Sequence, residues 1–217
     1  MTVRDPDTLR SGVQRASIDG IVDALRGLYT KDSTTGKPLL AGSMGRLELV
    51  QSQSATAATV DFTTGIVAGY DYEMDIEGLV LGTDGTAAWL RVSTDGGSTY
   101  KAGVSDYRWA FWAVADDGTS GAGADIADSE ITLTAAFGNA SGEHFDATVR
   151  IRSPGSTALH KRVMWHGAYA TTVGLEVSVT GSGRYLATTA INGIRIMSSD
   201  GVAFSAGTIT LRRKWRS

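Results

Sequence analysis

The histidines are the first side chains to consider for acid–base or metal chemistry, because the chain has three of them and no cysteine. They are His144, His160 and His166. Only His144 has carboxylates within two residues, at Glu143 and Asp146. Imidazole and carboxylate groups transfer protons and bind metal ions. No His-x-x-x-His or Glu-x-x-His spacing occurs, so the pattern favours ordinary surface histidines and predicts no metal site and no cofactor.

Carboxylates in loops are a second candidate for metal binding, because calcium prefers oxygen ligands. The loop acids that could serve are Asp116, Asp117, Asp125 and Asp128. The twelve-residue EF-hand spacing is absent, and Asp beside Gly is common in turns. We therefore interpret these acids as turn residues and expect no bound calcium.

Four further acids alternate with apolar residues in the run 70–77, which places them on one face of a strand. They are Asp71, Glu73, Asp75 and Glu77. Glycoside hydrolysis needs two acids on opposite sides of a cleft, whereas acids on one strand face keep that face soluble or protect a sheet edge. The nucleophile motif Gly-x-Ser-x-Gly is also missing. The sequence therefore predicts no enzyme, with a polysaccharide hydrolase as the weakest alternative.

The segment 93–100 matches the Asp-box pattern Ser-x-Asp-x-Gly-x-Thr-aromatic, with Tyr100 at the aromatic place. In that motif the Asp and Ser/Thr side chains stabilise their own hairpin, and several copies would indicate a sialidase-like propeller. One copy is present, so we predict a turn between the apolar runs 87–92 and 107–113, in which Asp95 bonds to backbone of its own loop. The residues of this structural hairpin are Ser93, Asp95, Gly97 and Thr99.

Aromatic residues are concentrated in the run 107–112, where alternation separates two faces. Tyr107, Trp109 and Phe111 share one face, which we expect to be core. The opposite face carries Trp112 together with Arg108. An exposed aromatic ring beside a cation fits either a subunit contact or a glycan-binding platform, and the rarity of large exposed apolar patches favours the subunit contact or burial.

Composition excludes several classes of function. The net charge is −3 and the pI is about 5.6, so there is no overall attraction to nucleic acid. No apolar run approaches the ~18 residues of a membrane span, and no signal peptide is visible. The basic residues near the C-terminus either solvate the end of a strand or contact an acidic partner; they are Arg212, Arg213, Lys214 and Arg216.

The first 45 residues differ in period from the rest and predict an amphipathic helix over roughly 18–29, with Ser17 as N-cap candidate and an earlier start at Asp5 or Asp7 as the alternative. Gly20 and Gly27 weaken this helix, so we expect it to need a partner surface. A linker is predicted at 30–38. The apolar stripe that would anchor the helix consists of Ile18, Ile21, Val22, Leu25 and Leu28.

From residue 46 the period is two, and about ten short strands are separated by Gly- and Asp-containing turns. There are 27 Gly and 3 Pro, which suits many tight turns. This pattern predicts an all-β fold, an antiparallel two-sheet sandwich that is jelly-roll-like, in residues 46–217, preceded by the helical arm 1–45.

The order of several segments resembles that of bacteriophage tail-fibre and head-fibre β-sandwich proteins, including those of prophages. The resemblance covers about residues 46–214 and rests on the segments 47–54, 60–66, 70–77, 90–100, 106–108 and 191–197. Proteins of this type are structural or adhesive and often trimeric. The resemblance therefore implies a virion protein made in the host cytoplasm, with no catalytic residues to transfer.

These observations lead to one leading hypothesis and one main alternative. The leading hypothesis is a virion subunit (a fibre, spike or decoration protein), expected to be a homotrimer, whose residues 1–45 anchor it to capsid, portal or tail proteins and whose sandwich serves host attachment. The alternative is a carbohydrate-binding module for host surface glycan. Neither requires nucleic acid or membrane insertion.

Overall fold

The computed structural model describes residues 29–31, 38–40 and 47–216, which divide between two compact units, Met1–Arg46 with Ser217 and Leu47–Arg216. In the first unit, β1 (Tyr29–Lys31) and β2 (Pro38–Leu40) pair antiparallel. The predicted linker at 30–38 therefore begins in β1 and ends in β2. The sequence did not predict these two short strands. The predicted anchoring helix, with Ile18, Ile21, Val22, Leu25 and Leu28, lies outside the described residues.

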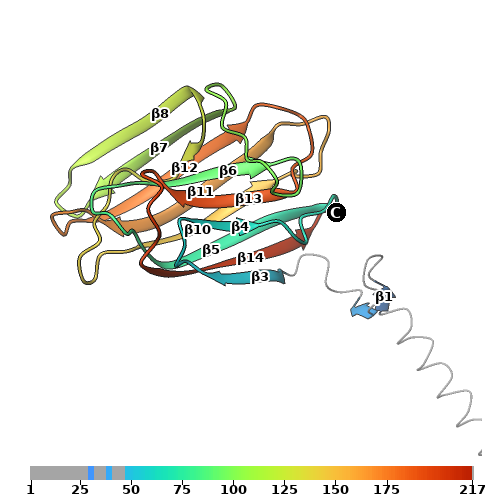
Figure 1. The fold of residues 1–217 in the computed structure, drawn as a ribbon, viewed down its shortest axis with the longest axis horizontal. Helices are drawn as coiled ribbons and strands as arrows, with labels where there is room; N and C mark the ends of the chain where they lie inside the picture. Colours follow the sequence, from blue (N-terminus) through green and yellow to red (C-terminus); the bar gives the residue numbers. More distant parts are fainter. Residues whose placement is uncertain (1–28, 32–37, 41–46, 217) are drawn as a thin grey trace, which may run out of the picture. The chain divides into compact units, whose positions relative to one another are not determined.

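The second unit is all-β and consists of two antiparallel sheets, as the alternation predicted (Figure 1). The large sheet has eight strands in the order β3-β14-β5-β10-β11-β12-β7-β8, and the small sheet has four in the order β4-β13-β6-β9. The strands are β3 (Glu48–Ser54), β4 (Thr59–Phe62), β5 (Tyr70–Val80), β6 (Ala88–Ser93), β7 (Tyr107–Ala115), β8 (Ser120–Asp128), β9 (Ile131–Thr132), β10 (Phe145–Arg152), β11 (Lys161–Ala170), β12 (Glu176–Tyr185), β13 (Gly193–Ser198) and β14 (Ala206–Trp215).

Eight of these strands pair in a nested order along the chain. The first pairs with the last, β3 with β14, and the same rule gives β4 with β13, β5 with β10 and β6 with β9. The remaining strands form two antiparallel hairpins, β7–β8 and β11–β12, which are inserted into this order and pair with each other through β12 and β7. These hairpins widen only the large sheet.

Both sheets contribute to one hydrophobic core, because their strands bury alternate side chains. In β10, for example, Phe145, Val149 and Ile151 are fully buried. The small sheet adds Leu90 from β6 and Ile196 from β13, which are also fully buried. The opposite side chains of β10 point away from this core and form part of the exposed face of the large sheet.

Two pairs of neighbouring strands place an aromatic ring over a glycine. Trp165 of β11 lies across Gly181 of β12, where an added Cβ would be 2.1 Å from the indole Cζ2. Phe111 of β7 lies across Gly123 of β8, where the corresponding distance is 2.5 Å. Glycine leaves room for the ring to cover the neighbouring backbone, which offsets the weak packing of a glycine-rich strand.

Strand β8 was missed in the sequence analysis, because its residues SGAGADIAD carry almost no apolar alternation and are mostly exposed. Backbone pairing with β7 forms this edge strand. Apolar residues alternate from Ile131 to Phe137, which is typical of one strand, but β9 ends at Thr132. Leu133 and Phe137 are nevertheless buried, so the alternation there correctly indicated burial but not a continuous strand.

The acidic strand β5 lies inside the large sheet, between β14 and β10, so its acids do not protect an edge. Instead they pair across the sheet: Glu73 with Arg150 at 2.7 Å and Asp71 with Arg152 at 2.8 Å. Asp75 pairs with Arg212 of β14. The C-terminal basic cluster is therefore used within the sheet, since Arg213 also pairs with Glu48 at 3.1 Å and Arg216 with Asp71 at 3.6 Å.

Candidate functional site

The best candidate for a binding site is the exposed face of the large sheet, which we define as the outward side chains of β5, β10, β11, β12 and β7. Register brings these side chains into rows that cross the strands. One row runs from Asp75 through Thr148, His166 and Thr180 to Trp112. Residues far apart in sequence are thus neighbours on one continuous surface.

Trp112 is 54% exposed on this face, so it is not part of the core of its own chain. Arg108 lies on the same face, as predicted, but Ala110 separates the two, which places them about 13 Å apart at the usual rise of a strand. Trp109 and Phe111 are only partly buried on the opposite side, where their rings stack at 5.6 Å between centroids. The expected core face of β7 is therefore fully buried only at Tyr107.

A shallow hollow of about 620 Å³ adjoins Trp112. Its floor is made of small residues, including Ala110, Thr180 and Ser182, and its other side is formed by Met164 and Arg150. An aromatic ring above a floor of hydroxyl groups can stack on the apolar face of a sugar ring while the hydroxyls exchange hydrogen bonds. This geometry fits carbohydrate better than an apolar ligand.

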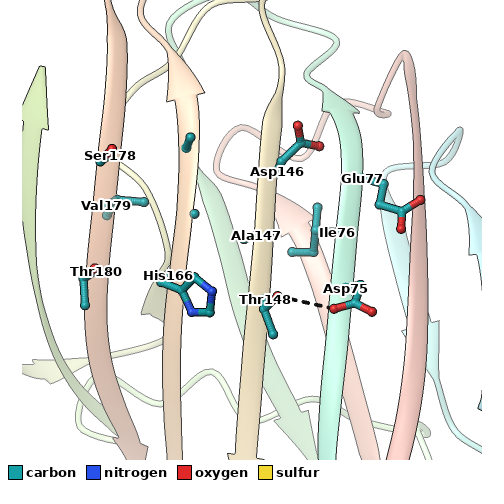
Figure 2. A pocket seen from close by; sticks show the side chains of 12 residues that line it. Asp75, Ile76, Glu77, Asp146, Ala147, Thr148, His166, Ser178, Val179 and Thr180 are labelled. Atoms are coloured by element: carbon teal, nitrogen blue, oxygen red, sulfur yellow. Dashed lines mark hydrogen bonds between the residues drawn. The ribbon is translucent and has the colours of Figure 1, made fainter. Parts of the chain in front are cut away.

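A second hollow of about 670 Å³ lies beside it, toward β5 (Figure 2). Asp75, Glu77, Asp146 and His166 line it, and two of the three acids, Asp75 and Asp146, already have partners. Asp75 pairs with Arg212 and accepts from Thr148 Oγ1 at 3.4 Å. Asp146 accepts from the Gly78 amide at 2.5 Å, and its other oxygen lies 3.0 Å from His144 Nε2. These contacts explain Asp75 and Asp146 as structural groups, whereas Glu77 is exposed on the same face.

Metal binding finds no support in the described residues, where no group of three or more His, Cys, Asp or Glu side chains could hold an ion. The candidate loop acids are used locally: Asp117 Oδ1 accepts from the Thr119 amide and Asp125 Oδ1 from the Ala127 amide, both at 2.8 Å. No helix in the described part of the chain is long and apolar enough to cross a membrane.

The Ser93–Thr99 loop is closed by its own side chains. Asp95 Oδ1 accepts from the Thr99 amide at 2.9 Å and from Ser93 Oγ at 2.7 Å, and its other oxygen accepts from Thr99 Oγ1 at 2.5 Å. The Gly97 amide donates to Ser93 Oγ at 2.9 Å. The hydrogen bonds from Ser93 and Thr99 lower the pKa of Asp95 to about 2. The expected bond from Asp95 to backbone of its own loop is therefore present.

This loop is not a hairpin, however, because the strands on either side of it do not pair. β6 belongs to the small sheet and β7 to the large sheet, so the loop begins a connection between the sheets. It is also fixed from outside, since the Gly96 amide donates to Asn192 Oδ1 at 2.8 Å. The local motif was visible in the sequence, but the partners of the two strands depend on long-range contacts.

Tyr100, the aromatic residue of the motif, covers a charge pair on the outer face of the small sheet. Arg195 donates to both oxygens of Asp61, at 2.7 and 2.6 Å, and its guanidinium lies 3.8 Å from the centroid of the Tyr100 ring. Desolvation raises the pKa of Tyr100 to about 12. The motif thus secures the small sheet and contributes no side chain to the exposed face of the large sheet.

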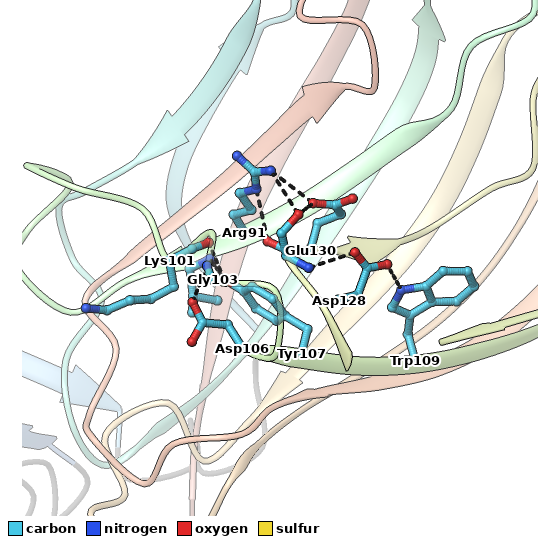
Figure 3. Close-up of polar contacts among 10 residues, drawn as sticks. Arg91, Lys101, Gly103, Asp106, Tyr107, Trp109, Asp128 and Glu130 are labelled. Atoms are coloured by element: carbon cyan, nitrogen blue, oxygen red, sulfur yellow. Dashed lines mark hydrogen bonds and ion pairs between the residues drawn. The ribbon is translucent and has the colours of Figure 1, made fainter. Parts of the chain in front are cut away.

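A second polar network fixes the beginning of β7 (Figure 3). The Tyr107 hydroxyl donates to the Lys101 carbonyl at 3.1 Å and accepts from the Val92 amide at 2.9 Å, and desolvation raises the pKa of Tyr107. Trp109 Nε1 donates to Asp128 at 2.7 Å. These contacts hold β7 against the small sheet and against β8, so they position Arg108 between them on the exposed face.

The same network includes Arg91 of β6, which pairs with the buried Glu130 at 2.9 Å and donates to the Ser129 carbonyl at 3.1 Å. Glu130 also accepts from the Ser129 hydroxyl. This cluster joins the end of β8 to the small sheet. Its acid is buried and paired, which fits a structural role in joining the two sheets.

Comparison with known proteins adds little. No protein-family profile and no curated protein matches the sequence. A solved structure of the infectious bursal disease virus VP2 subviral particle aligns over 87% of this chain and 46% of that chain, with 11% identity and a TM-score of 0.12. The chain thus spans less than half of that viral protein, and a similarity of this size carries no argument about fold or function.

Proposed function

We propose that the chain is a structural subunit of a bacteriophage or prophage virion that presents the exposed face of its large sheet for host attachment. The observation that carries this proposal is the nested strand pairing. Without the two inserted hairpins, the sheets read β3-β14-β5-β10 and β4-β13-β6-β9. This is the order of an eight-stranded jelly roll, an architecture used by viral capsid and lectin domains.

The proposal assigns separate tasks to the two units. Residues 1–45 are proposed as the anchoring arm, because the amphipathic helix predicted from the sequence would need a partner surface, and three copies would join through it into a trimer docked on capsid, portal or tail proteins. The second unit has a core of its own and serves as the projecting part. Assembly takes place in the host cytoplasm, and the mature location is the virion.

A glycan-binding module is the second candidate function, and one specific observation favours it. Trp112 stands exposed beside a floor of small and hydroxyl-bearing residues. The two functions are compatible, because a virion attachment protein often acts by binding a surface glycan. A subunit contact through Trp112 remains the competing explanation of its exposure.

The anchoring role is tested in the full chain with Ile21→Asp/Leu25→Asp, two changes in the predicted apolar stripe. We expect native mass spectrometry to show monomers in place of trimers, and immunogold imaging to find the variant absent from particles. Thermal unfolding of the sheets should be unchanged. Val104→Asp/Val173→Asp is the matched control: both side chains are 78% exposed in loops of the second unit, and this variant should still assemble. Trimers and particle incorporation that persist in the double variant would refute the anchoring role.

A further inference from the structure

Four arginines lie directly opposite one another on four adjacent strands of the exposed face. Arg152 of β10 is opposite Arg162 of β11, Arg162 is opposite Arg184 of β12, and Arg184 is opposite Arg108 of β7. At about 4.8 Å between neighbouring strands, this arginine row extends over about 14 Å. The four residues come from separate parts of the sequence, so only the fold brings them together.

The row is poorly neutralised by the protein itself. Arg152 pairs with Asp71 at 2.8 Å. Within the described part of the chain, no carboxylate lies within ion-pair distance of Arg108, Arg162 or Arg184. Three other arginines of the large sheet, Arg150, Arg212 and Arg213, do have acidic partners. Like charges placed directly opposite destabilise a sheet, so this row weakens the fold unless an anion covers it.

Two hollows lie along the row and share Arg162 and Arg184. One, of about 430 Å³, also includes Arg152, and the other, of about 360 Å³, includes Arg108. The first is walled by the loop 153–160, which is held in place by Lys161. This buried side chain donates to the carbonyls of Ser156, Leu159 and Thr188 at 2.5, 3.0 and 2.7 Å. The arginines thus line a shaped surface.

The hollow at Arg108 continues into the hollow at Trp112, because Ala110 and Ser182 line both. A ligand on the arginines can therefore reach the exposed indole ring over a floor of small residues. Guanidinium groups bind carboxylate and phosphate oxygens in pairs, and aromatic rings stack on sugars. A row of charges with one aromatic platform fits an extended acidic sugar chain.

We propose that the arginine row and Trp112 form one binding surface for an acidic polysaccharide that bears carboxylate or phosphate groups. This inference rests on the proposed attachment role and specifies its ligand class. Nucleic acid is the less favoured polyanion, because the chain carries a net charge of −3 and this surface offers one exposed aromatic ring. An acidic protein is also less favoured, because the arginines alone would bind it and the hydroxyl-lined floor beside Trp112 would make no contact with it.

The test measures binding of the full-length chain to polygalacturonate, which supplies carboxylates, and to a phosphorylated mannan, which supplies phosphates, with dextran as the neutral polymer. We expect binding to at least one acidic polymer, which identifies the anionic group, and none to dextran. Arg162→Gln and Arg184→Gln should each weaken binding by about tenfold or more. Lys101→Gln is the matched control: it removes the same charge from the β6–β7 connection, which lines neither hollow, and should change affinity less than twofold.

Three results would overturn the inference: no binding to either acidic polymer, equal weakening by Lys101→Gln, or tighter binding of poly(dT) or polyglutamate than of the acidic polysaccharides. The last would indicate a nucleic-acid or protein contact. The melting temperature of Arg184→Gln should not fall, which separates lost binding from lost folding. Particle incorporation of Arg162→Gln is followed in parallel. Binding by a chain that never enters particles would refute the virion role alone, whereas incorporation without binding would refute this inference alone.

Discussion

Gly181→Ala is the sharpest test of how the large sheet is built beneath its exposed face. A methyl group at this position would lie 2.1 Å from Cζ2 and 2.4 Å from Cε2 of Trp165. Trp165 is 2% exposed, and its Nε1 donates to the Leu133 carbonyl at 2.8 Å, so the ring has little freedom to move aside. The backbone of Gly181 does not have a positive φ, so the cost comes from the collision alone.

The expected destabilisation combines two effects. Overpacking of a core costs about 1–3 kcal/mol. Displacing the indole from the Leu133 carbonyl removes a hydrogen bond worth about 1 kcal/mol. A total of about 2–4 kcal/mol corresponds to a decrease of roughly 4–16 °C in melting temperature for a domain of this size.

The assay is thermal unfolding followed by circular dichroism, with Gly121→Ala as the matched control. Gly121 lies in the edge strand β8, and no atom lies within 4 Å of its added Cβ. That variant should be neutral or stabilised by up to about 1 kcal/mol, because alanine restricts the unfolded chain. If Gly181→Ala were as stable as Gly121→Ala, Trp165 would not lie across Gly181, and the register of β11 with β12 would be wrong.

Two further predictions concern the loop and the small sheet. Because the pKa of Asp95 is lowered from its ordinary 3.8 to about 2, its contribution to stability is present above pH 3.8 and is lost as the pH falls through 2. Acid titration should therefore destabilise the wild type more steeply between pH 4 and 2 than Asp95→Asn, and equal slopes would contradict the closed loop. Asp61→Ala should cost about 1–3 kcal/mol, since it leaves the half-buried Arg195 unpaired. A double-mutant cycle with Arg195→Met should show strong coupling, whereas additive effects would rule out the pair as a stabilising unit.

Local patterns made much of the fold predictable. Alternation identified the buried side of β5, and the spacing of Ser93, Asp95 and Thr99 identified a loop that bonds to itself. These signals depend on neighbours in sequence. Strand β8 has no such signal, because its residues form no hydrophobic face of their own, and Gly123 is required by the ring of Phe111 in the neighbouring strand.

The candidate site was less predictable, because it depends on register. Trp112 was recognised from alternation within one strand, but its distance from Arg108 was not. Arg162 and Arg184 do not stand out in the sequence, because each occupies an outward-facing strand position, where charged residues are common. Only the pairing of β11 with β12 makes them neighbours, and a shift of one residue would turn either side chain inward.

The residues assigned to binding and the residues of the core lie mostly in different strands. Of the residues assigned to binding, Arg152 alone belongs to one of the eight nested strands, whereas Arg162, Arg184, Arg108 and Trp112 belong to the inserted hairpins. The eight nested strands and the loops between them supply most residues of the core between the two sheets. The hairpins extend the large sheet and add outward side chains at little cost to that core. Substitutions on the outward side of the hairpins should therefore change binding more than stability, and substitutions in the nested strands should do the reverse.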